Sequence, residues 1–363
     1  MKKNKLFLYW EKEDKRSIIS FFLRFLSLLY LTGYLIRKSL YGLGLIKPKK
    51  LSAKVISIGN ITVGGSGKTP FVLYLAKKLM EKKVNFAILT RGYKRLSKDT
   101  IELEKIDSPD IKWEEVGDEP YLLSNHLPEI PIIVDKDRFH SGRIAQDKYK
   151  ADFLLLDDGF QHWRLKRDLD ILMIDSSIDL EKEKLLPSGR LREPLSSLKR
   201  ANLFVLTRVD QSERRDKVIK LLQKYNPQAP IVESILQMSS VQDWKDKTEI
   251  DLSQLQGKKG LAFCGIGNPF SFERTLKSSG LEILNAFFFL DHYIYTRKDL
   301  LSMQTEAKKS GASYLITTEK DSIRLPDTGE LTIPLLVVKV ELKIISGEKK
   351  TLGDFEYLKN QSF

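Results

Sequence analysis

The glycine-rich segment at residues 55–70 constrains the fold of this chain more than any other feature. It reads VISIGNITVGGSGKTP: a β-branched run enters a turn, and Gly67-Lys68-Thr69 then opens a helix. This succession is the context of a P-loop, in which backbone N–H groups and a helix N-terminus surround phosphate oxygens. The residues predicted to bind the nucleotide are Thr62, Val63, Gly64, Gly65, Ser66, Gly67, Lys68 and Thr69.

Two side chains of this loop have predicted chemical roles. Lys68 is expected to reach the β- and γ-phosphates, and the hydroxyl of Thr69 is expected to bind Mg²⁺. The loop departs from the pattern G-x-x-x-x-G-K-[ST] at one position, where Thr62 stands in place of the first glycine. Strand, turn and helix nevertheless follow in the order that a P-loop requires.

Two adjacent acids are the predicted partners of that metal ion. Asp157 and Asp158 follow the four apolar residues 153–156, so they lie at the tip of a predicted buried strand. Carboxylates at this place are expected to hold the Mg²⁺ of a bound nucleotide, directly or through water. The sequence leaves open which of the two binds it directly.

Short apolar runs alternate with amphipathic stretches after Pro48. This alternation predicts an α/β fold of the P-loop NTPase type, with a mostly parallel sheet and helices on both faces. A helix is expected at 70–82. Strands are expected at 54–58, 86–90, 131–134, 153–156, 170–174 and 203–206, and a second set near 260–264, 314–317 and 335–340.

The chain is expected to form three parts. Its 363 residues can build two cores, and we interpret the polar stretch 237–256 as the boundary between the two sets of strands. The predicted parts are an N-terminal helical segment, a P-loop domain and a smaller C-terminal α/β domain, at 1–50, 51–240 and 241–363. The single cysteine, Cys264, excludes a disulfide framework and indicates a reducing, intracellular compartment.

Positive charge is concentrated at the N-terminus. Residues 1–50 contain twelve Lys/Arg and three Asp/Glu, so they carry +9 of the net charge of +13. Residues 17–36 read SIISFFLRFLSLLYLTGYLI, in which Arg24 is the single charge. We interpret this segment as a helix that lies in the surface of an anionic membrane, because a central arginine disfavours a true span. A single span and a helix packed on its own domain remain alternatives. Nucleic acid is not expected as a partner, because the aromatic residues alternate with leucines and not with basic residues.

Several motifs together resemble one enzyme family. They are GNITVGGSGKTP, LLLDDGFQH, Thr90-Arg91-Gly92-Tyr93, Gly117-Asp118-Glu119-Pro120, LPSGRLREP at 186–194, Asp291-His292 and Thr318-Glu-Lys-Asp321. Their order and their spread over nearly the whole chain are similar to tetraacyldisaccharide 4′-kinase, the lipid A pathway kinase of Gram-negative bacteria. Thr62 is also similar to what that family shows.

The resemblance implies a reaction and a set of site residues. The γ-phosphate of ATP would be transferred to the 4′-hydroxyl of tetraacyldisaccharide 1-phosphate, with Mg²⁺ as cofactor, to give lipid IV-A. By resemblance, the catalytic residues are Asp118 as the base, His292 as its assistant and Lys68. The residues expected to contact the acylated disaccharide are Arg91, Gln161, His162, Arg192 and Glu193.

The same resemblance implies a cellular location. Two alternative functions are also considered. The enzyme is expected at the cytoplasmic face of the bacterial inner membrane, as a peripheral or monotopic protein, and no obligate protein partner is evident. One rival is a membrane-associated nucleotide switch, because Thr207-Arg208-Val209-Asp210 loosely resembles the guanine-reading Asn-Lys-x-Asp of GTPases. The other is a lipid-sensing scaffold without catalysis, against which the complete set of predicted acids argues.

Overall fold

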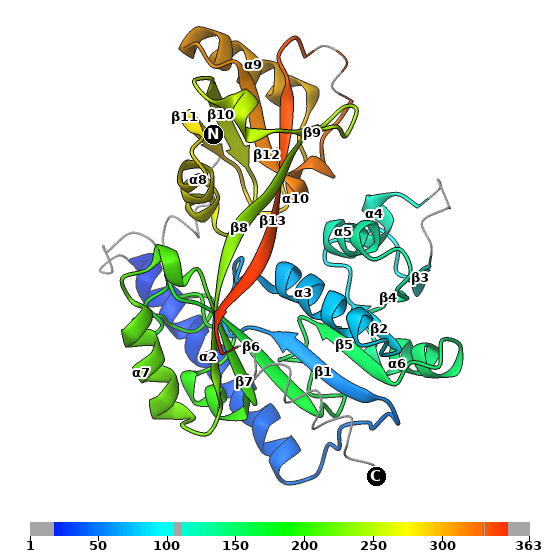
Figure 1. Ribbon diagram of the computed structural model, residues 1–363. Coiled ribbons are helices and arrows are strands. Elements are labelled where there is room, and N and C mark those ends of the chain that lie inside the picture. The colour runs from blue at the N-terminus through cyan, green and yellow to red at the C-terminus, as the bar shows by residue number, and fades with distance from the viewer. Residues whose placement is uncertain (1–17, 105–110, 328, 330, 348–363) are drawn as a thin grey trace. The chain divides into compact units, whose positions relative to one another are not determined.

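The computed structural model describes residues 18–104, 111–327, 329 and 331–347 (Figure 1). These residues form two compact units, which divide between Ile235 and Leu236 and again between Lys343 and Ile344. The larger unit contains the glycine-rich loop. The lysines and arginines at positions 2–16, which contribute to the predicted basic N-terminus, lie outside the described residues.

The sheet of the larger unit is parallel except at one edge. Its strands follow the order β8-β7-β6-β1-β5-β2-β4-β3, and only β3 pairs in the antiparallel direction. Every residue of β2, β5, β6 and β7 is buried, as expected of parallel strands covered on both faces. The strands are β1 (Lys54–Gly59), β2 (Phe86–Thr90), β3 (Ile101–Leu103), β4 (Ile132–Val134), β5 (Phe153–Asp157), β6 (Leu169–Asp175), β7 (Leu203–Thr207) and β8 (Ile231–Asp243).

Helices cover both faces of this sheet. Ala145 of α6 packs in one core cluster with Leu154 and Leu156 of β5, so the alternating Leu155 faces the other side, where α3 contacts β1 and β5. α3 begins at Lys68 and tolerates Pro70 because the first turn of a helix has no intrahelical N–H partner. The helices are α2 (Ile18–Gly42), α3 (Lys68–Glu81), α4 (Trp113–Val116), α5 (Asp118–His126), α6 (Arg138–Asp147) and α7 (Arg215–Tyr225), with short 3-10 helices η1 (Leu195–Arg200) and η2 (Val209–Gln211).

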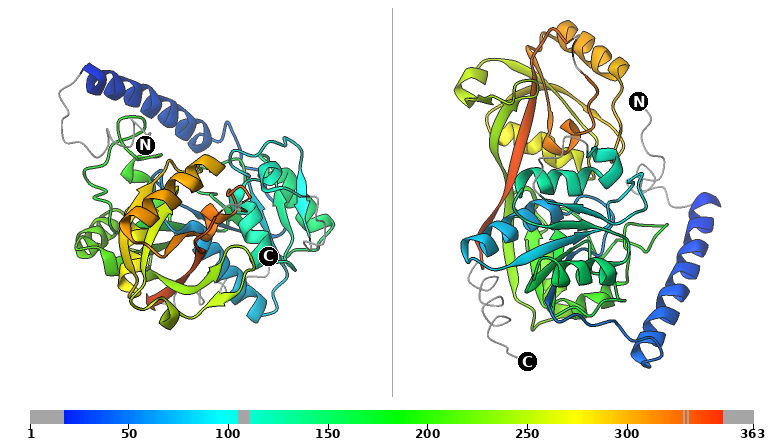
Figure 2. Two further views of the ribbon diagram at one scale, coloured as in Figure 1. Left: turned by 90° about the horizontal axis from the view of Figure 1, so that it is seen from above. Right: turned by 90° about the vertical axis from the view of Figure 1, so that its right-hand side faces the viewer.

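Helix α2 lies along the outside of the larger unit (Figure 2), and several of its large apolar side chains are exposed. Phe21, Phe25 and Leu28 are exposed by 76%, 52% and 62%, whereas Tyr34 and Tyr41 pack edge-on against Trp163. Within the described residues, one helix, at Ile19–Gly42, is long and apolar enough to cross a membrane, and only 6% of its most apolar window is buried. The helix therefore faces the protein with its hydroxyl-bearing and aromatic side and faces outward with its apolar side.

The smaller unit has an α/β fold of its own. Strands β10, β11, β12 and β13 pair in parallel in the order β11-β10-β12-β13, with β8 beside β13 and β9 antiparallel to β8. Helices α8 and α9 belong to different core clusters, which contain alternate residues of β10 and therefore cover opposite faces. The elements are β9 (Glu249–Ile250), β10 (Lys259–Cys264), β11 (Glu282–Phe288), β12 (Tyr314–Thr318), β13 (Leu335–Ser346), α8 (Pro269–Ser278), α9 (Arg297–Ser310), α10 (Glu319–Ser322) and η3 (Leu252–Leu255).

The predicted fold class is confirmed. Each expected strand exists within two residues of its predicted start, and the sheet is mostly parallel with helices on both faces. The polar stretch 237–256 contains the second part of β8, then β9 and η3, and β11 has no counterpart among the predicted strands. Both β8 and β11 carry partly exposed residues in place of a continuous apolar run. The functional division at 1–50, 51–240 and 241–363 stays a prediction.

Candidate active site

The P-loop lies at the carboxyl end of β1, near the middle of the larger unit's sheet. β1 lies between β5 and β6, so the loop opens where the chain order of the sheet reverses, the usual ligand position in α/β folds. Gly64 and Gly67 have φ values of 113° and 81°, which favour glycine. Asn60 Nδ2 donates to Ser66 Oγ at 2.9 Å, and Thr207 Oγ1 donates to the Ser66 carbonyl at 3.2 Å. The loop is therefore held by its own side chains and by β7.

Thr62 is compatible with this loop because its backbone is paired as in a strand. Thr62 and Leu191 form an antiparallel bridge, and Val63 N donates to the Arg190 carbonyl at 2.8 Å beside it. A residue in such a bridge does not need the left-handed conformations that only glycine adopts readily. The departure from the general P-loop pattern thus has a local structural cause.

The two predicted metal acids lie one strand away from the loop lysine. Asp157 ends β5 and is in parallel register with Ile58 of β1. Lys68 Nζ lies 3.4 Å from Asp158 Oδ1, and Arg192 Nη1 lies 2.8 Å from Asp158 Oδ2. The structure therefore brings together three of the predicted groups: the lysine of the loop, the acid pair and an arginine assigned to the substrate.

The two acids differ in their titration. Burial raises the pKa of Asp157 to about 6, and the negative charges of Glu119 and Asp158 add to this effect. Burial also acts to raise the pKa of Asp158, but the neighbouring Lys68 and Arg192 lower that pKa well below its ordinary value. Asp158 is therefore a permanent anion, whereas Asp157 exchanges its proton close to neutral pH.

A glycine contact places the motif of Asp118 beside the acid pair. Gly117 and Gly92 pack together, and a Cβ on Gly117 would lie 3.2 Å from Gly92 Cα. Gly117 caps α5, whose first residue is the buried Asp118. Two residues before Gly92, Thr90 Oγ1 donates to Asp157 Oδ2 at 3.1 Å. The carboxyl ends of β2 and β5 and the start of α5 therefore lie together. We use 'this edge' for the edge of the sheet formed by the carboxyl ends of its strands.

Two charged residues of this edge are absent from the sequence prediction. Glu119 is close enough to contribute to the raised pKa of Asp157. Arg138 is 4% exposed, donates to the Asp135 carbonyl, and interacts electrostatically with Asp157 and Asp158. Burial lowers the pKa of Arg138 to about 10, so it stays charged at neutral pH. The available signal was its position directly after a strand of the same parallel sheet, at the start of a helix.

The remaining predicted substrate residues lie around this edge in different environments. Arg91 is exposed at the end of β2. Gln161 Nε2 donates to the Asn60 carbonyl at 2.9 Å. Burial, together with the positive charges of Arg138 and other arginines, lowers the pKa of His162 to about 4, so its ring is neutral at pH 7.

Glu193 is only 2% exposed and its carboxylate is bound by Arg200 at 2.6 Å. The guanidinium of Arg200 in turn lies over the rings of Phe160 and Trp163 at 4.2 and 4.7 Å. Glu193 is thus held by an arginine that is itself packed against two aromatic rings.

His292 belongs to the smaller unit. Its φ is 61°, its backbone N donates to the Gly265 carbonyl at 3.1 Å, and its Nε2 lies 3.8 Å from Asp291 Oδ1. The same Gly265 carbonyl accepts from Arg324 Nη2 at 3.2 Å, and Gly265 N donates to the buried Asp321 at 2.9 Å. The partnership of His292 with Asp118 stays a prediction.

Comparison with known proteins decides the family. The sequence model described as LpxK, tetraacyldisaccharide-1-P 4′-kinase, matches residues 19–355. The chain belongs to this kinase family. The tetraacyldisaccharide 4′-kinase of Halothermothrix orenii is 39% identical over 85% of this chain and 83% of its own length. That of Elusimicrobium minutum is 38% identical over 91% and 89%. The crystal structure of LpxK from Aquifex aeolicus in complex with ATP superposes with a TM-score of 0.69, at 33% identity, over 92% of this chain and 96% of that one.

The donor set at this edge fits the Mg²⁺ that a kinase of this family would use with ATP. Thr69 supplies a hydroxyl and Asp157 and Asp158 supply carboxylates, which are the oxygen ligands that Mg²⁺ prefers. Within the ranges that the structure describes, no group of three or more His, Cys, Asp or Glu side chains forms a metal cage of its own. A site of few protein ligands completed by phosphate oxygens and water is the usual form of Mg²⁺ binding.

Proposed function

We propose that this protein transfers the γ-phosphate of ATP to the 4′-hydroxyl of tetraacyldisaccharide 1-phosphate, at a membrane surface and with Mg²⁺. The observation that carries the proposal is the meeting of the P-loop lysine with two carboxylates of the neighbouring strand, one ionised and one with a raised pKa. Membership of the 4′-kinase family supports the choice of acceptor.

The nucleotide would be held by the backbone of the P-loop. N–H groups of the turn and the positive end of α3 face the β- and γ-phosphates, and Lys68 adds a full positive charge. Lys68 now contacts Asp158; a bound γ-phosphate would compete with that carboxylate for the lysine. When bound, Mg²⁺ would be held by Thr69 with Asp157 and Asp158, and it would neutralise charge on the phosphates.

Asp118 is the proposed base. A sugar hydroxyl is a weak nucleophile, so its proton must leave as the oxygen attacks phosphorus. In the proposed step the 4′-oxygen bonds to the γ-phosphorus, the bond to the ADP oxygen breaks, and the hydroxyl proton moves to the Asp118 carboxylate. His292 would hold that carboxylate or share the proton. Arg138 and Arg192 would balance the negative charge of the acid pair during this transfer.

The sugar and its phosphate would contact the exposed rim of the same edge. Arg91 and Arg192 are the proposed anion contacts, and Gln161 and His162 the proposed hydrogen-bonding groups. Nε2 of His162 is buried and, among the described residues, has no hydrogen-bond partner, which suits a contact to a substrate hydroxyl. For Glu193 we propose a positioning role through Arg200.

Helix α2 is the proposed membrane contact. A large exposed apolar surface on a helix is stable only against lipid or another protein, and the substrate is itself a lipid. The described lysines near the end of α2, at positions 38, 47, 49 and 50, would meet anionic headgroups. We propose that α2 lies in the cytoplasmic surface of the inner membrane, because its inward side is used in contacts with the protein.

Transfer of ³²P from labelled ATP to purified tetraacyldisaccharide 1-phosphate tests the proposal. Wild type is expected to transfer, Asp118→Asn to lose a factor of roughly 10²–10⁴ in kcat, and Lys68→Met to lose nucleotide binding. Asp210→Asn is the matched control, because Asp210 is exposed in the loop that resembles a guanine-binding motif.

The outcomes separate the rival functions. GTP hydrolysis without lipid phosphorylation, abolished by Asp210→Asn, would replace the kinase with a nucleotide switch. Against that rival, Arg208 of the same loop is buried in an ion pair with Asp175 at 2.6 Å. Transfer that persists in Asp118→Asn would keep the kinase and remove Asp118 as its base.

A further inference from the structure

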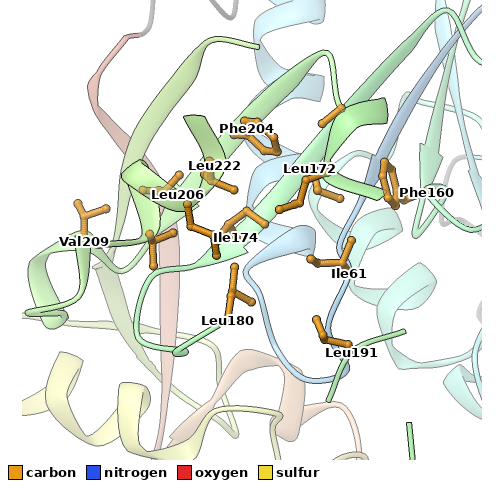
Figure 3. Close-up of a cluster of buried hydrophobic side chains, with 14 residues drawn as sticks. Ile61, Phe160, Leu172, Ile174, Leu180, Leu191, Phe204, Leu206, Val209 and Leu222 are labelled. Carbon is orange, nitrogen blue, oxygen red and sulfur yellow. The ribbon is translucent and has the colours of Figure 1, made fainter. Parts of the chain in front are cut away.

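Residues 185–193, which we call the strap, pack against the P-loop. The backbone N of Arg192 donates to the Ile61 carbonyl at 2.7 Å, next to the bridge between Leu191 and Thr62. The side chains of Leu191 and Ile61 lie in one buried apolar cluster (Figure 3). The position of the strap therefore determines the course of the first half of the P-loop.

Helix α2 holds the opposite side of the strap. Tyr30 OH donates to the carbonyl of Arg192 at 2.6 Å. One turn earlier, Ser27 Oγ accepts from Ser188 N at 3.1 Å and lies 3.0 Å from the Leu185 carbonyl oxygen. The strap is thus hydrogen-bonded at both of its ends to a single helix.

Arg192 connects three parts of the larger unit. Its carbonyl is bound by Tyr30, its N–H by the P-loop, and its guanidinium by Asp158 at 2.8 Å. A movement of α2 that breaks the contact with Tyr30 would therefore release a residue that also contacts the nucleotide site. Arg192 is the point at which helix and site are joined.

A second, parallel connection runs through Gln161. Arg37 Nη2 of α2 donates to the Gln161 carbonyl at 2.9 Å, and Gln161 Nε2 donates to the Asn60 carbonyl of the P-loop at 2.9 Å. Arg37 also stacks over Trp163 at 4.9 Å. Two routes of direct hydrogen bonds thus join one face of α2 to the loop.

We propose that Tyr30 is a positioning residue that couples the nucleotide site to the surface on which α2 docks. The proposed docking surface rests on the function proposed above, whereas the action of Tyr30 on the P-loop rests on the contacts alone. Lipid that covers the outward face of α2 restrains the helix, then the strap and then the P-loop. The nucleotide therefore binds to a loop that is already ordered, and its affinity rises. Such coupling is reciprocal: the nucleotide strengthens lipid binding by the same factor.

The first test needs no lipid. The full-length protein is titrated with Mg²⁺ and a non-hydrolysable ATP analogue, as wild type, Tyr30→Phe and Tyr41→Phe. Tyr41 is the matched control, because it lies three turns away on the same face of α2, its ring packs on Trp163, and among the described residues its hydroxyl has no hydrogen-bond partner. One neutral hydrogen bond corresponds to a loss of about 2- to 10-fold in affinity for Tyr30→Phe, with Tyr41→Phe within a factor of two of wild type. Equal affinities of the two variants would overturn the proposal.

The second test adds vesicles of phosphatidylglycerol and phosphatidylethanolamine. Wild type and Tyr41→Phe are expected to bind the analogue more tightly when vesicles are present, by a factor within that same range, and to bind vesicles more tightly when the analogue is present. Without the analogue, Tyr30→Phe should float with vesicles as wild type does. Vesicles should not raise its affinity for the analogue, and the analogue should not raise its affinity for vesicles. A merely structural defect would not produce this combination. Flotation with no change in analogue affinity in the wild type would overturn the coupling.

The tests distinguish this inference from the function on which it depends. If wild type does not float with vesicles, the membrane part of the proposed function fails, and the lipid-free titration still decides whether Tyr30 positions the P-loop. If the protein floats and the two tyrosine variants behave alike, the inference fails and the proposed function stands.

Discussion

Substitution of Gly92 by alanine should move the motif that carries Asp118 without touching the P-loop. Gly92 has φ of 65°, and a Cβ at this position would overlap the Val116 carbonyl oxygen and lie 2.7 Å from Val134 Cγ1. One of the two facing backbones must therefore retreat by about 1 Å to restore van der Waals contact. The segment that retreats leads directly to Gly117 and Asp118.

The expected cost has two parts. Left-handed backbone costs an alanine about 1–2 kcal/mol, and overpacking against a backbone that cannot rotate away costs about 1–3 kcal/mol more. Gly44→Ala separates them, because Gly44 has φ of 72° and no atom within 4 Å of the added Cβ. Gly92→Ala should therefore lower the free energy of unfolding by about 1–3 kcal/mol more than Gly44→Ala does.

Urea unfolding followed by tryptophan fluorescence measures this difference, since Trp113 begins the short helix that ends at Val116. In the kinase assay, Gly92→Ala should lose roughly 10- to 100-fold in kcat, because Asp118, the proposed base, would be poorly aligned after a displacement of about 1 Å. Its KM for ATP should stay unchanged. If Gly92→Ala matched Gly44→Ala in both stability and kcat, the glycine contact would not position Asp118 and the reasoning would be wrong.

Three further predictions follow from the same structure. Because the folded pKa of His162 is lowered to about 4, the unfolded chain binds the extra proton first as pH falls from about 6.5. His162 should therefore lower stability between pH 6.5 and 4 by up to about 1.4 kcal/mol per pH unit, while the raised pKa of Asp157 acts in the opposite direction. In urea titrations His162→Gln should consequently gain stability relative to wild type, by up to that amount per pH unit, as pH falls through this range. Arg324→Met should destabilise the smaller unit by about 3–5 kcal/mol, because it leaves the fully buried Asp321 without its ion pair; a shift below 1 kcal/mol in thermal unfolding would contradict this account. The double change Phe21→Ser and Phe25→Ser should weaken flotation with anionic vesicles at least tenfold without changing unfolding, since both side chains are exposed, and unchanged flotation would assign docking to another surface.

Much of the fold could be predicted because parallel strands are buried on both faces. Continuous apolar runs such as Phe153–Asp157 and Phe86–Thr90 therefore stand out from the amphipathic stretches between them. β11 was not predicted, because an edge strand is partly exposed and its residues do not form a continuous apolar run. β8 was not predicted either, because polar residues interrupt its second part.

The groups with the strongest local pattern were also predictable. A P-loop needs glycine, lysine and threonine at adjacent positions, so Lys68 and Thr69 are visible in one short segment. Asp157 and Asp158 are visible because they follow a buried strand in a chain that also carries a P-loop, whose Mg²⁺ needs a carboxylate at the end of a nearby strand. Glu119 stands in the GDEP motif and Arg138 between a strand and a helix, but neither position specifies a role, and only the folded chain places the two near Asp157.

By itself, the sequence determined the class of fold, the phosphate-binding loop, the acid pair and an apolar helix next to positive charge, because each is encoded by neighbouring residues. Tertiary structure alone decided how those acids titrate, since the raised pKa of Asp157 and the lowered pKa of Asp158 depend on groups distant in the chain. It also decided that Thr62 is held by Leu191 and that Tyr30 binds Arg192. These contacts join residues more than a hundred positions apart, and no local pattern of side chains specifies them.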